Sequence, residues 1–338
     1  MIRLLENYNL AAYNTFGIAA KTKSFFEFTE ADELVYFLQE HSLPEHFFIL
    51  GGGSNLLLKN DFEGLVIYPN VPGVGEIDED RNHIYIEAGA GVEWDELVRL
   101  SVVYQLGGLE NLSLIPGKVG AAPVQNVGAY GAEAKDKIHL VRAVELATGQ
   151  KVEFSNHECQ FGYRNSIFKN ELKNKVVITS VVFKLDKFPE FNLAYGSLND
   201  EVAKNGEVAL QNVRDAVIRI RQSKLPDPLE IGNAGSFFKN PVVPDELAAN
   251  LKSKYPDMPS YPSGFDGETK LAAGWLIEQC GWKGFREGHV GVHKDQALVL
   301  VNYGGASGAE LVALADKIQQ SVYKKFAVKL QPEVNIVG

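Results

Sequence analysis

Length, composition and charge exclude several classes of protein before any motif is considered. The chain has 338 residues, 45% of them hydrophobic and 22% charged, which is typical of a globular protein with two or three domains. A formal net charge of −10 argues against binding to nucleic acid or to an anionic membrane, because clustered lysine and arginine hold such partners. The two cysteines, Cys159 and Cys280, are too few for a disulfide scaffold or a cysteine-rich zinc site, and we interpret them as buried thiols.

The start of the sequence does not resemble a targeting signal. Charged residues interrupt it before an apolar signal-peptide core develops, and no later run approaches the ~20 apolar residues of a membrane-spanning helix. We therefore expect a cytoplasmic protein.

The first two thirds of the chain mixes short strands with helices. Helices are expected where apolar residues recur at helical spacing, from 29 to 38, 94 to 106 and 213 to 221. Strands are expected over residues 47–50, 65–68, 83–88, 141–146 and 176–185.

Two prolines, Pro226 and Pro228, indicate a domain boundary after the helix that ends near residue 221. Beyond them we expect a helix over 269–280, an extended segment over 289–301, a long amphipathic helix opened by Ser307 and Glu310, and a last strand over 328–337. Because strands and helices do not alternate strictly, the pattern favours an α+β fold over a doubly wound sheet.

A glycine loop, Gly51-Gly52-Gly53-Ser54-Asn55, follows the strand at 47–50. It is not a Rossmann fingerprint, since the third glycine of that motif falls on Leu56 and the next segment reads as a strand, and it lacks the lysine of a Walker loop. Its successive N–H groups could form an anion-binding nest, but an ordinary glycine-rich turn remains an alternative.

A second segment of small residues, 114–131, contains four glycines and three alanines and is too broken by proline for regular structure. Such backbone can lie close to a flat or extended ligand. Two segments of this kind on either side of a helix favour one shared ligand, a dinucleotide-type cofactor.

Six segments in order resemble the UDP-N-acetylenolpyruvoylglucosamine reductase family, flavoenzymes of peptidoglycan precursor synthesis. They are Asn14–Gly17, the glycine loop, Ile115–Gly131, Gly162–Ser166, Gly232–Pro241 and Gln331–Val334. The resemblance implies an α+β flavin fold of the vanillyl-alcohol-oxidase (PCMH) type. It also implies two FAD-binding subdomains, residues 1–72 and 73–225, the latter joined by a strand at 327–338, and a substrate-binding domain over 226–326.

The same resemblance implies the chemistry. NADPH would reduce a non-covalently bound FAD, which would in turn reduce UDP-N-acetylglucosamine enolpyruvate to UDP-N-acetylmuramate; no histidine for covalent attachment lies between residues 50 and 59. Phe191–Gly196 resembles the tyrosine loop of the long, loop-bearing subtype. We expect a monomer that binds small molecules only. The alternatives are another FAD oxidoreductase of this fold, such as a sugar or hydroxyacid oxidase, and a silent flavin- or sugar-nucleotide-binding protein.

Site residues follow from the matching motifs. Arg164 would bind the substrate carboxylate, Ser236 would donate the proton, and Glu333 would polarise the enolpyruvyl group. Without the resemblance, these would read as a surface arginine, a turn serine and a strand-edge glutamate. The expected substrate contacts are Tyr163, Tyr195, Lys224, Asn240 and Gln296. The expected FAD contacts are Gly51, Gly52, Gly53, Ser54, Asn55, Leu56, Ser113, Ile115, Pro116, Gly117, Gly120, Ala121, Ala122, Gln125, Asn126 and Gly128.

His289, His293 and Asp295 could suggest a metal site. In an extended segment, residues i and i+4 lie too far apart to share one ion, so we expect no metal.

Overall fold

The computed structural model describes residues 3–338, which divide into two compact units, each built from separate stretches of the chain. The first unit contains residues 3–8, 22–52 and 63–223. The second contains Asn9–Lys21, Gly53–Phe62 and Lys224–Gly338. The units divide between Ser223 and Lys224, next to the boundary that the two prolines predict.

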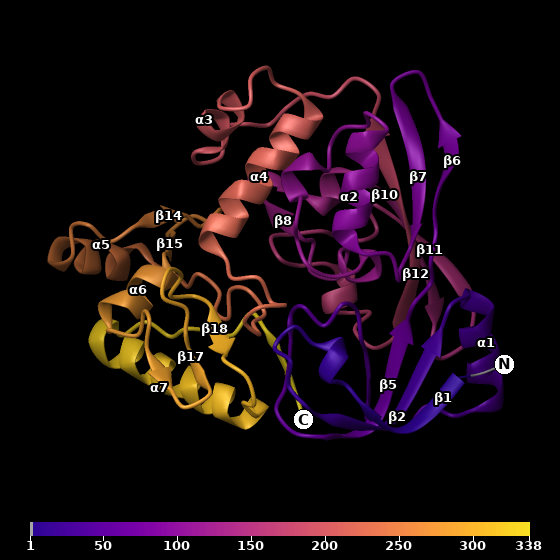
Figure 1. The fold of residues 1–338 in the computed structure, drawn as a ribbon, viewed down its shortest axis with the longest axis horizontal. Coiled ribbons are helices and arrows are strands. Elements are labelled where there is room, and N and C mark those ends of the chain that lie inside the picture. The colour runs from indigo at the N-terminus through magenta and orange to yellow at the C-terminus, as the bar shows by residue number, and fades with distance from the viewer. Residues whose placement is uncertain (1–2) are drawn as a thin grey trace. The chain divides into compact units, whose positions relative to one another are not determined.

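A five-stranded antiparallel sheet forms the centre of the first unit (Figure 1). Its order is β11-β10-β12-β7-β6. The strands are β6 (Val74–Glu79), β7 (His83–Gly89), β10 (Ile138–Glu145), β11 (Lys151–Ser155) and β12 (Val176–Asp186). The first eight residues of β12 are all buried, because this central strand is covered on both faces.

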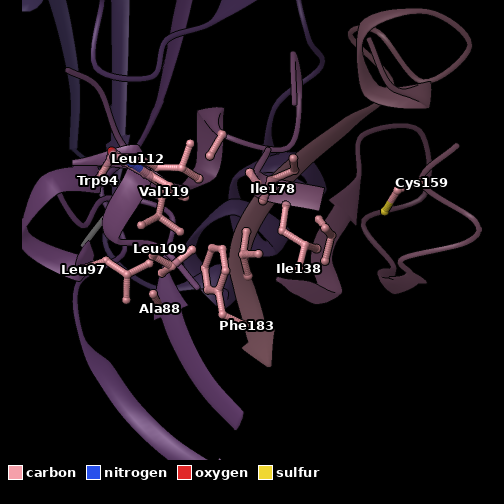
Figure 2. Packing of buried hydrophobic residues seen from close by; sticks show 14 of the residues in the cluster. Ala88, Trp94, Leu97, Leu109, Leu112, Val119, Ile138, Cys159, Ile178 and Phe183 are labelled. Atoms are coloured by element: carbon pink, nitrogen blue, oxygen red, sulfur yellow. The ribbon is translucent and has the colours of Figure 1, made fainter. Parts of the chain in front are cut away.

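Helix α2 (Trp94–Val103) packs on this sheet through the apolar face that its spacing predicts (Figure 2). The fully buried Trp94 meets Phe183 of β12 edge to face, with ring centroids 5.9 Å apart. Its indole Nε1 donates to the Leu112 carbonyl at 2.9 Å, so burial leaves no unpaired polar atom on this side chain.

A second sheet in the first unit has the order β1-β2-β5-β3. Its strands are β1 (Arg3–Asn9), β2 (Lys21–Phe28), β3 (Phe47–Ile49) and β5 (Phe62–Pro69). Helix α1 (Ala31–Glu40) packs against it, and the rings of Phe26 and Phe37 stack with centroids 4.1 Å apart.

Two further helices of the first unit form a small apolar cluster with the segment around Tyr130 and the tyrosine loop. They are α3 (Leu198–Ala203) and α4 (Leu210–Lys224). The short elements of this unit are β8 (Gly128–Ala129), β9 (Ala132–Glu133) and the 3-10 turns Glu110–Leu112, Val119–Ala121, Ala134–Asp136 and Ile167–Lys169.

The second unit is made of short strands and three helices. β4 (Leu56–Leu58) pairs in parallel with β19 (Asn335–Val337). Two three-stranded sheets contain β13 (Val242–Pro244), β15 (Glu268–Leu271) and β14 (Ser260–Pro262), and β16 (Arg286–Glu287), β17 (Val290–Val292) and β18 (Leu300–Asn302). The helices are α5 (Asp245–Lys254), α6 (Ala273–Gln279) and α7 (Gly308–Phe326), with a 3-10 turn at Ala11–Tyr13.

The predicted start of α7 is confirmed. Ser307 is the N-cap residue, and Glu310 N donates to its Oγ at 3.3 Å while Ser307 N donates to Glu310 Oε2 at 2.7 Å. This reciprocal capping box satisfies two backbone donors that the first turn would otherwise leave unpaired. α7 then packs against β17 and β18 (Figure 1).

Three expectations for the second unit were wrong in extent. The helix expected over 269–280 begins only at Ala273, because residues 268–271 pair with strands on both sides as β15. The extended segment 289–301 is two strands joined by a turn. The last strand covers only residues 335–337, and it pairs with β4 in place of the strands within 73–225. For β15 and β19, partners elsewhere in the chain decide the extent of the strand, and local pattern does not report them.

The state of the two cysteines and the lengths of the apolar helices can be compared with the expectations from the sequence. Both cysteines are free thiols; Cys159 is buried, and burial raises its pKa to about 12, whereas Cys280 is only half-buried. No helix within residues 3–338 is both long and apolar enough to cross a membrane.

Candidate active site

The two glycine-bearing segments meet within the first unit. A Cβ added to Gly52 would lie 2.6 Å from the Cα of Gly117, and one added to Gly51 would lie 2.8 Å from the Cβ of Ala121. Real Cβ atoms do not approach so closely, so glycine is required at both positions. The two segments that we expect to share one ligand are therefore in direct contact at these residues.

The rest of the glycine loop belongs to the second unit. Gly53 has φ +64°, and a Cβ there would lie 2.0 Å from the Tyr13 carbonyl oxygen. Asn55 Nδ2 donates to the Glu333 carbonyl at 3.3 Å, and the Asn55 carbonyl accepts from Asn335 N at 3.0 Å. The loop is thereby tied to the segment that contains Glu333.

Two polar side chains expected at FAD are already bonded within the first unit. Ser113 Oγ donates to the Glu110 carbonyl at 2.6 Å. The fully buried Asn126 donates to Glu133 Oε2 at 2.9 Å and to the Gly162 carbonyl at 3.0 Å, and accepts from Lys135 N at 3.0 Å. These two side chains support the segment from within and so are not free to bind a ligand.

A partly buried ion pair supports the start of this segment, and its two residues are absent from the sequence-based expectations. Leu114 has the left-handed φ of +58°, and its N–H donates to Asp95 Oδ1 at 2.5 Å. Arg214 of α4 holds both oxygens of Asp95, at 2.7 and 2.8 Å. Burial raises the pKa of Asp95, but the bonds from Arg214 and Leu114 outweigh it and hold that pKa below its ordinary value.

Arg164 follows the exposed Tyr163 in a tight turn of the first unit. Its φ is +54°, which is uncommon for a residue other than glycine. Nη2 of Arg164 donates to the Gly128 carbonyl at 2.8 Å, and the guanidinium carbon lies 5.9 Å from the centre of the Tyr163 ring. Arg164 therefore lies at the far end of the small-residue segment.

Tyr195 lies near the same segment. Its ring is 58% exposed and meets Tyr130 edge to face at 5.9 Å between centroids. Asn111 Nδ2 donates to the carbonyls of Tyr130 and Asn192, both at 2.8 Å, and so ties the tyrosine loop to that segment.

Arg221, in the last turn of α4, is a further residue that the motifs did not indicate. Burial lowers the pKa of its guanidinium, and the positive charge of Arg164 lowers it further, while Tyr130 and Asp95 act in the opposite direction. Within residues 3–338, its buried Nε has no hydrogen-bond partner.

Ser236 and Glu333 lie on neighbouring backbone segments of the second unit. Ser236 forms an antiparallel bridge with Val299, and the next two residues pair with the C-terminal segment. Glu333 N donates to the Phe237 carbonyl at 2.8 Å, and Phe238 bridges Pro332. The structure thus brings these two predicted residues together, whereas Arg164 belongs to the first unit.

The remaining predicted substrate contacts divide into two groups. Asn240 Oδ1 caps α6 by accepting from Ala273 N at 3.0 Å, and Gln296 Oε1 would lie 3.4 Å from a Cβ on Gly274, one residue further along that helix. These two therefore share the start of α6. Lys224 is exposed at the end of α4.

The first unit fits a dinucleotide cofactor. The backbones of the glycine loop and of the small-residue segment pack closely, the side chains of Ser113 and Asn126 are bonded within the unit, and the buried Nε of Arg221 has no hydrogen-bond partner among residues 3–338. This surface and the α+β fold suit an FAD-binding oxidoreductase, and two family models show that class. Residues 25–155 match the family model described as "FAD binding domain". Residues 227–337 match "UDP-N-acetylenolpyruvoylglucosamine reductase, C-terminal domain".

Full-length relatives agree with these models. A protein of Flavobacterium johnsoniae named UDP-N-acetylenolpyruvoylglucosamine reductase is 47% identical over 99% of this chain and 100% of its own length. One of the same name from Neisseria gonorrhoeae is 50% identical over 97% of this chain and 95% of its own. The chain belongs to the UDP-N-acetylenolpyruvoylglucosamine reductase family.

A solved structure shows the same fold. The crystal structure of UDP-N-acetylenolpyruvylglucosamine reductase from Thermus caldophilus matches with a TM-score of 0.69 at 22% identity, covering 100% of this chain and 99% of that one. The resemblance, the fold class and the FAD cofactor are therefore confirmed.

Proposed function

We infer from the family that the chain reduces the enolpyruvyl ether of UDP-N-acetylglucosamine to the lactyl ether of UDP-N-acetylmuramate, a step of peptidoglycan precursor synthesis. We propose that Arg164, Ser236 and Glu333 carry out the protein's part of this reaction. FAD, when bound, supplies hydride transfer from NADPH to the substrate. The observation that carries the proposal is the backbone pairing that holds Ser236 beside the Glu333 segment.

Arg164 is proposed to bind the substrate carboxylate. Hydride addition to the vinyl CH₂ drives negative charge toward the α-carbon and the carboxylate, so a cation there stabilises the transition state more than the ground state. The bond from Arg164 to the Gly128 carbonyl orients the planar guanidinium and adds no negative charge of its own.

Ser236 is proposed to donate the proton that the α-carbon takes up, and Glu333 to polarise the enolpyruvyl group. A serine is a weak acid, so its position must come from a fixed backbone. The bridge to Val299 and the bond from Glu333 N to the Phe237 carbonyl would hold both residues in place.

The other expected contacts stay part of the proposal. We propose that FAD binds non-covalently to the backbone of the glycine loop and of the small-residue segment. Tyr163, Tyr195, Lys224, Asn240 and Gln296 would then bind the sugar nucleotide, with Lys224 at the diphosphate. We also propose the division into flavin-binding residues 1–72 and 73–225 and substrate-binding residues 226–326, a monomeric state and a cytoplasmic location.

Stopped-flow separation of the two half-reactions tests the role of Ser236. The S236A variant should reduce bound FAD with NADPH at the wild-type rate, yet reoxidation by the enolpyruvyl substrate should slow at least ~100-fold, because the proton is needed only in that stage. S253A, which removes an exposed hydroxyl on α5, is the matched control and should leave both rates unchanged. Equal slowing of both half-reactions by S236A would show a structural role and contradict the proposal.

A further inference from the structure

The side chain of Lys118 is a nearly buried cation within the small-residue segment. Only 10% of this side chain is exposed, and its Nζ donates to two neutral acceptors, Asn70 Oδ1 at 3.0 Å and the Gly91 carbonyl at 2.9 Å. The ammonium also lies over the ring of Tyr68, 5.0 Å from the ring centroid. These contacts replace water around the ammonium, but they leave its positive charge unbalanced.

The carboxylates near Lys118 balance little of this charge. Among residues 3–338, its ion-pair partner is Glu93, but Nζ and Oε1 are 3.8 Å apart and the Glu93 side chain is 65% exposed. Water and salt screen a pair of this kind. Asn70 also donates to Glu27, but that carboxylate already pairs with Arg3. The first unit therefore keeps a net positive charge at this position.

The backbone of Lys118 lies where the two glycine-bearing segments meet. A Cβ added to Gly52 would lie 3.2 Å from Lys118 N, as well as 2.6 Å from the Cα of Gly117. The same backbone is fixed by α2, because Trp94 N donates to the Gly117 carbonyl at 2.9 Å. The ammonium is therefore held within the length of one lysine side chain from the proposed FAD surface.

The diphosphate is the part of FAD that suits a cation at this position. It carries two negative charges, whereas the chain has a net charge of −10 and so repels anions at long range. Backbone N–H groups offer only partial positive charges. A full positive charge nearby stabilises the bound dianion, and burial of that charge reduces its screening by salt.

We propose that Lys118 is a positioning residue whose charge balances the FAD diphosphate, in addition to the backbone groups that contact the cofactor. This deepens the proposed function and rests on its placement of FAD at the two glycine-bearing segments. The bonds to Asn70 and Gly91 keep the ammonium close to the segment, so the charge is in place before FAD binds.

The affinity for FAD tests the charge. Titration of the FAD-free protein with FAD, followed by quenching of flavin fluorescence, should give a Kd about 10- to 30-fold higher for K118M than for the wild type. K118R keeps the charge and should recover most of the affinity. K137M is the matched control with a wild-type Kd, because it removes a partly buried lysine of the same unit that already pairs with Asp186. A wild-type Kd for K118M would overturn the proposal.

A flavin without phosphate separates the charge from a purely structural role. Riboflavin has the ring system and ribityl chain of FAD but lacks the diphosphate, so K118M should change the Kd of riboflavin less than about twofold. Equal weakening of FAD and riboflavin, or no recovery in K118R, would show that Lys118 only supports the fold of the segment. Either result would overturn the proposal.

The G52A variant keeps this test separate from that of the proposed function. Alanine at this position would force the two segments apart, because its Cβ would overlap the Cα of Gly117. If G52A weakens FAD binding and K118M does not, the charge role is wrong and the placement of FAD stands. If G52A binds FAD as tightly as the wild type, the placement itself fails. Neither measurement uses the enolpyruvyl substrate, so neither depends on the three proposed catalytic residues.

Discussion

Helix α4 carries two arginines, Arg214 and Arg221, whose surroundings differ sharply. Arg214 is 6% exposed, yet Asp95 satisfies it with two short bonds and so joins α4 to α2 and to the Leu114 backbone. Arg221, two turns later, keeps a buried Nε that has no hydrogen-bond partner in the described part of the chain. A buried charge whose hydrogen bonds are all made within the protein supports the architecture, whereas a buried donor without a partner carries a desolvation cost that no bond offsets.

Among the changes that test this comparison, removal of Asp95 should lower the free energy of unfolding most. D95A leaves Arg214 buried without its counter-ion and frees the Leu114 N–H, so we expect a loss of ~3 kcal/mol in the free energy of unfolding. That value is at the low end for a buried pair because the Asp95 side chain is 31% exposed. Urea unfolding of the FAD-free protein measures it, and D95A/R214M should recover part of the loss. No recovery would show that Asp95 acts mainly through Leu114.

The geometry of the pair can be weakened without removing its charge. R214K keeps one positive charge but cannot hold both Asp95 oxygens in a planar fork, so we expect a loss of about 1–2 kcal/mol. The same unfolding measurement applies. Stability equal to that of the wild type would mean that the charge alone matters and that the two short bonds contribute little.

Acid should remove the contribution of the same pair. The pKa of Asp95 is lower in the folded state than its ordinary value near 3.9, so its stabilisation is fully present above that value and is lost as pH falls through the folded pKa. The difference in unfolding free energy between wild type and D95N should therefore be constant from pH 7 to about 5 and shrink below pH ~4. A difference that persists unchanged at pH 2 would contradict this account.

The smallest effect should come from the exposed pair on the same helix. Arg219 donates to Glu201 at 2.8 Å, but both groups reach solvent, where water and salt screen the attraction. R219M should unfold at the same urea concentration as the wild type within error. A measurable loss would show that this pair contributes more to α4 than its exposure suggests.

The two units also differ in how much of them the sequence predicts. In the first, β7, α2 and β12 follow from local periodicity, because long elements bury a whole face against one core. In the second, the strand at 268–271 and the short β19 depend on partners elsewhere in the chain, so local pattern misjudged their type or extent. Residues 269 and 270 lie just before α6 in the sequence, but β13 and β14 pair with them on either side.

The residues of the candidate site also differ in how far the sequence could predict them. Glycines 51, 52 and 117 could be recognised because runs of small residues are visible in the sequence, although the contact that requires Gly51 and Gly52 joins segments distant in the chain. Asp95 and Arg214 lie 119 positions apart, and neither belongs to a motif, so no sequence signal links them. The inward bonding of Asn126 was missed for a related reason, since an asparagine in a glycine-rich segment reads equally well as a ligand or as a turn support.

The pairing of β4 with β19 has a consequence for the order in which the chain can fold during synthesis. Asn335 Nδ2 donates to the carbonyl of Asn55, 280 positions earlier, so the strand of three consecutive leucines at 56–58 is made long before its neighbour. The first unit has all its residues once Ser223 leaves the ribosome. At about 5–20 residues per second, β19 then follows roughly 6 to 23 s later. Throughout that interval the leucine strand lacks the strand that pairs with it, so its unpaired edge is open to incorrect pairing.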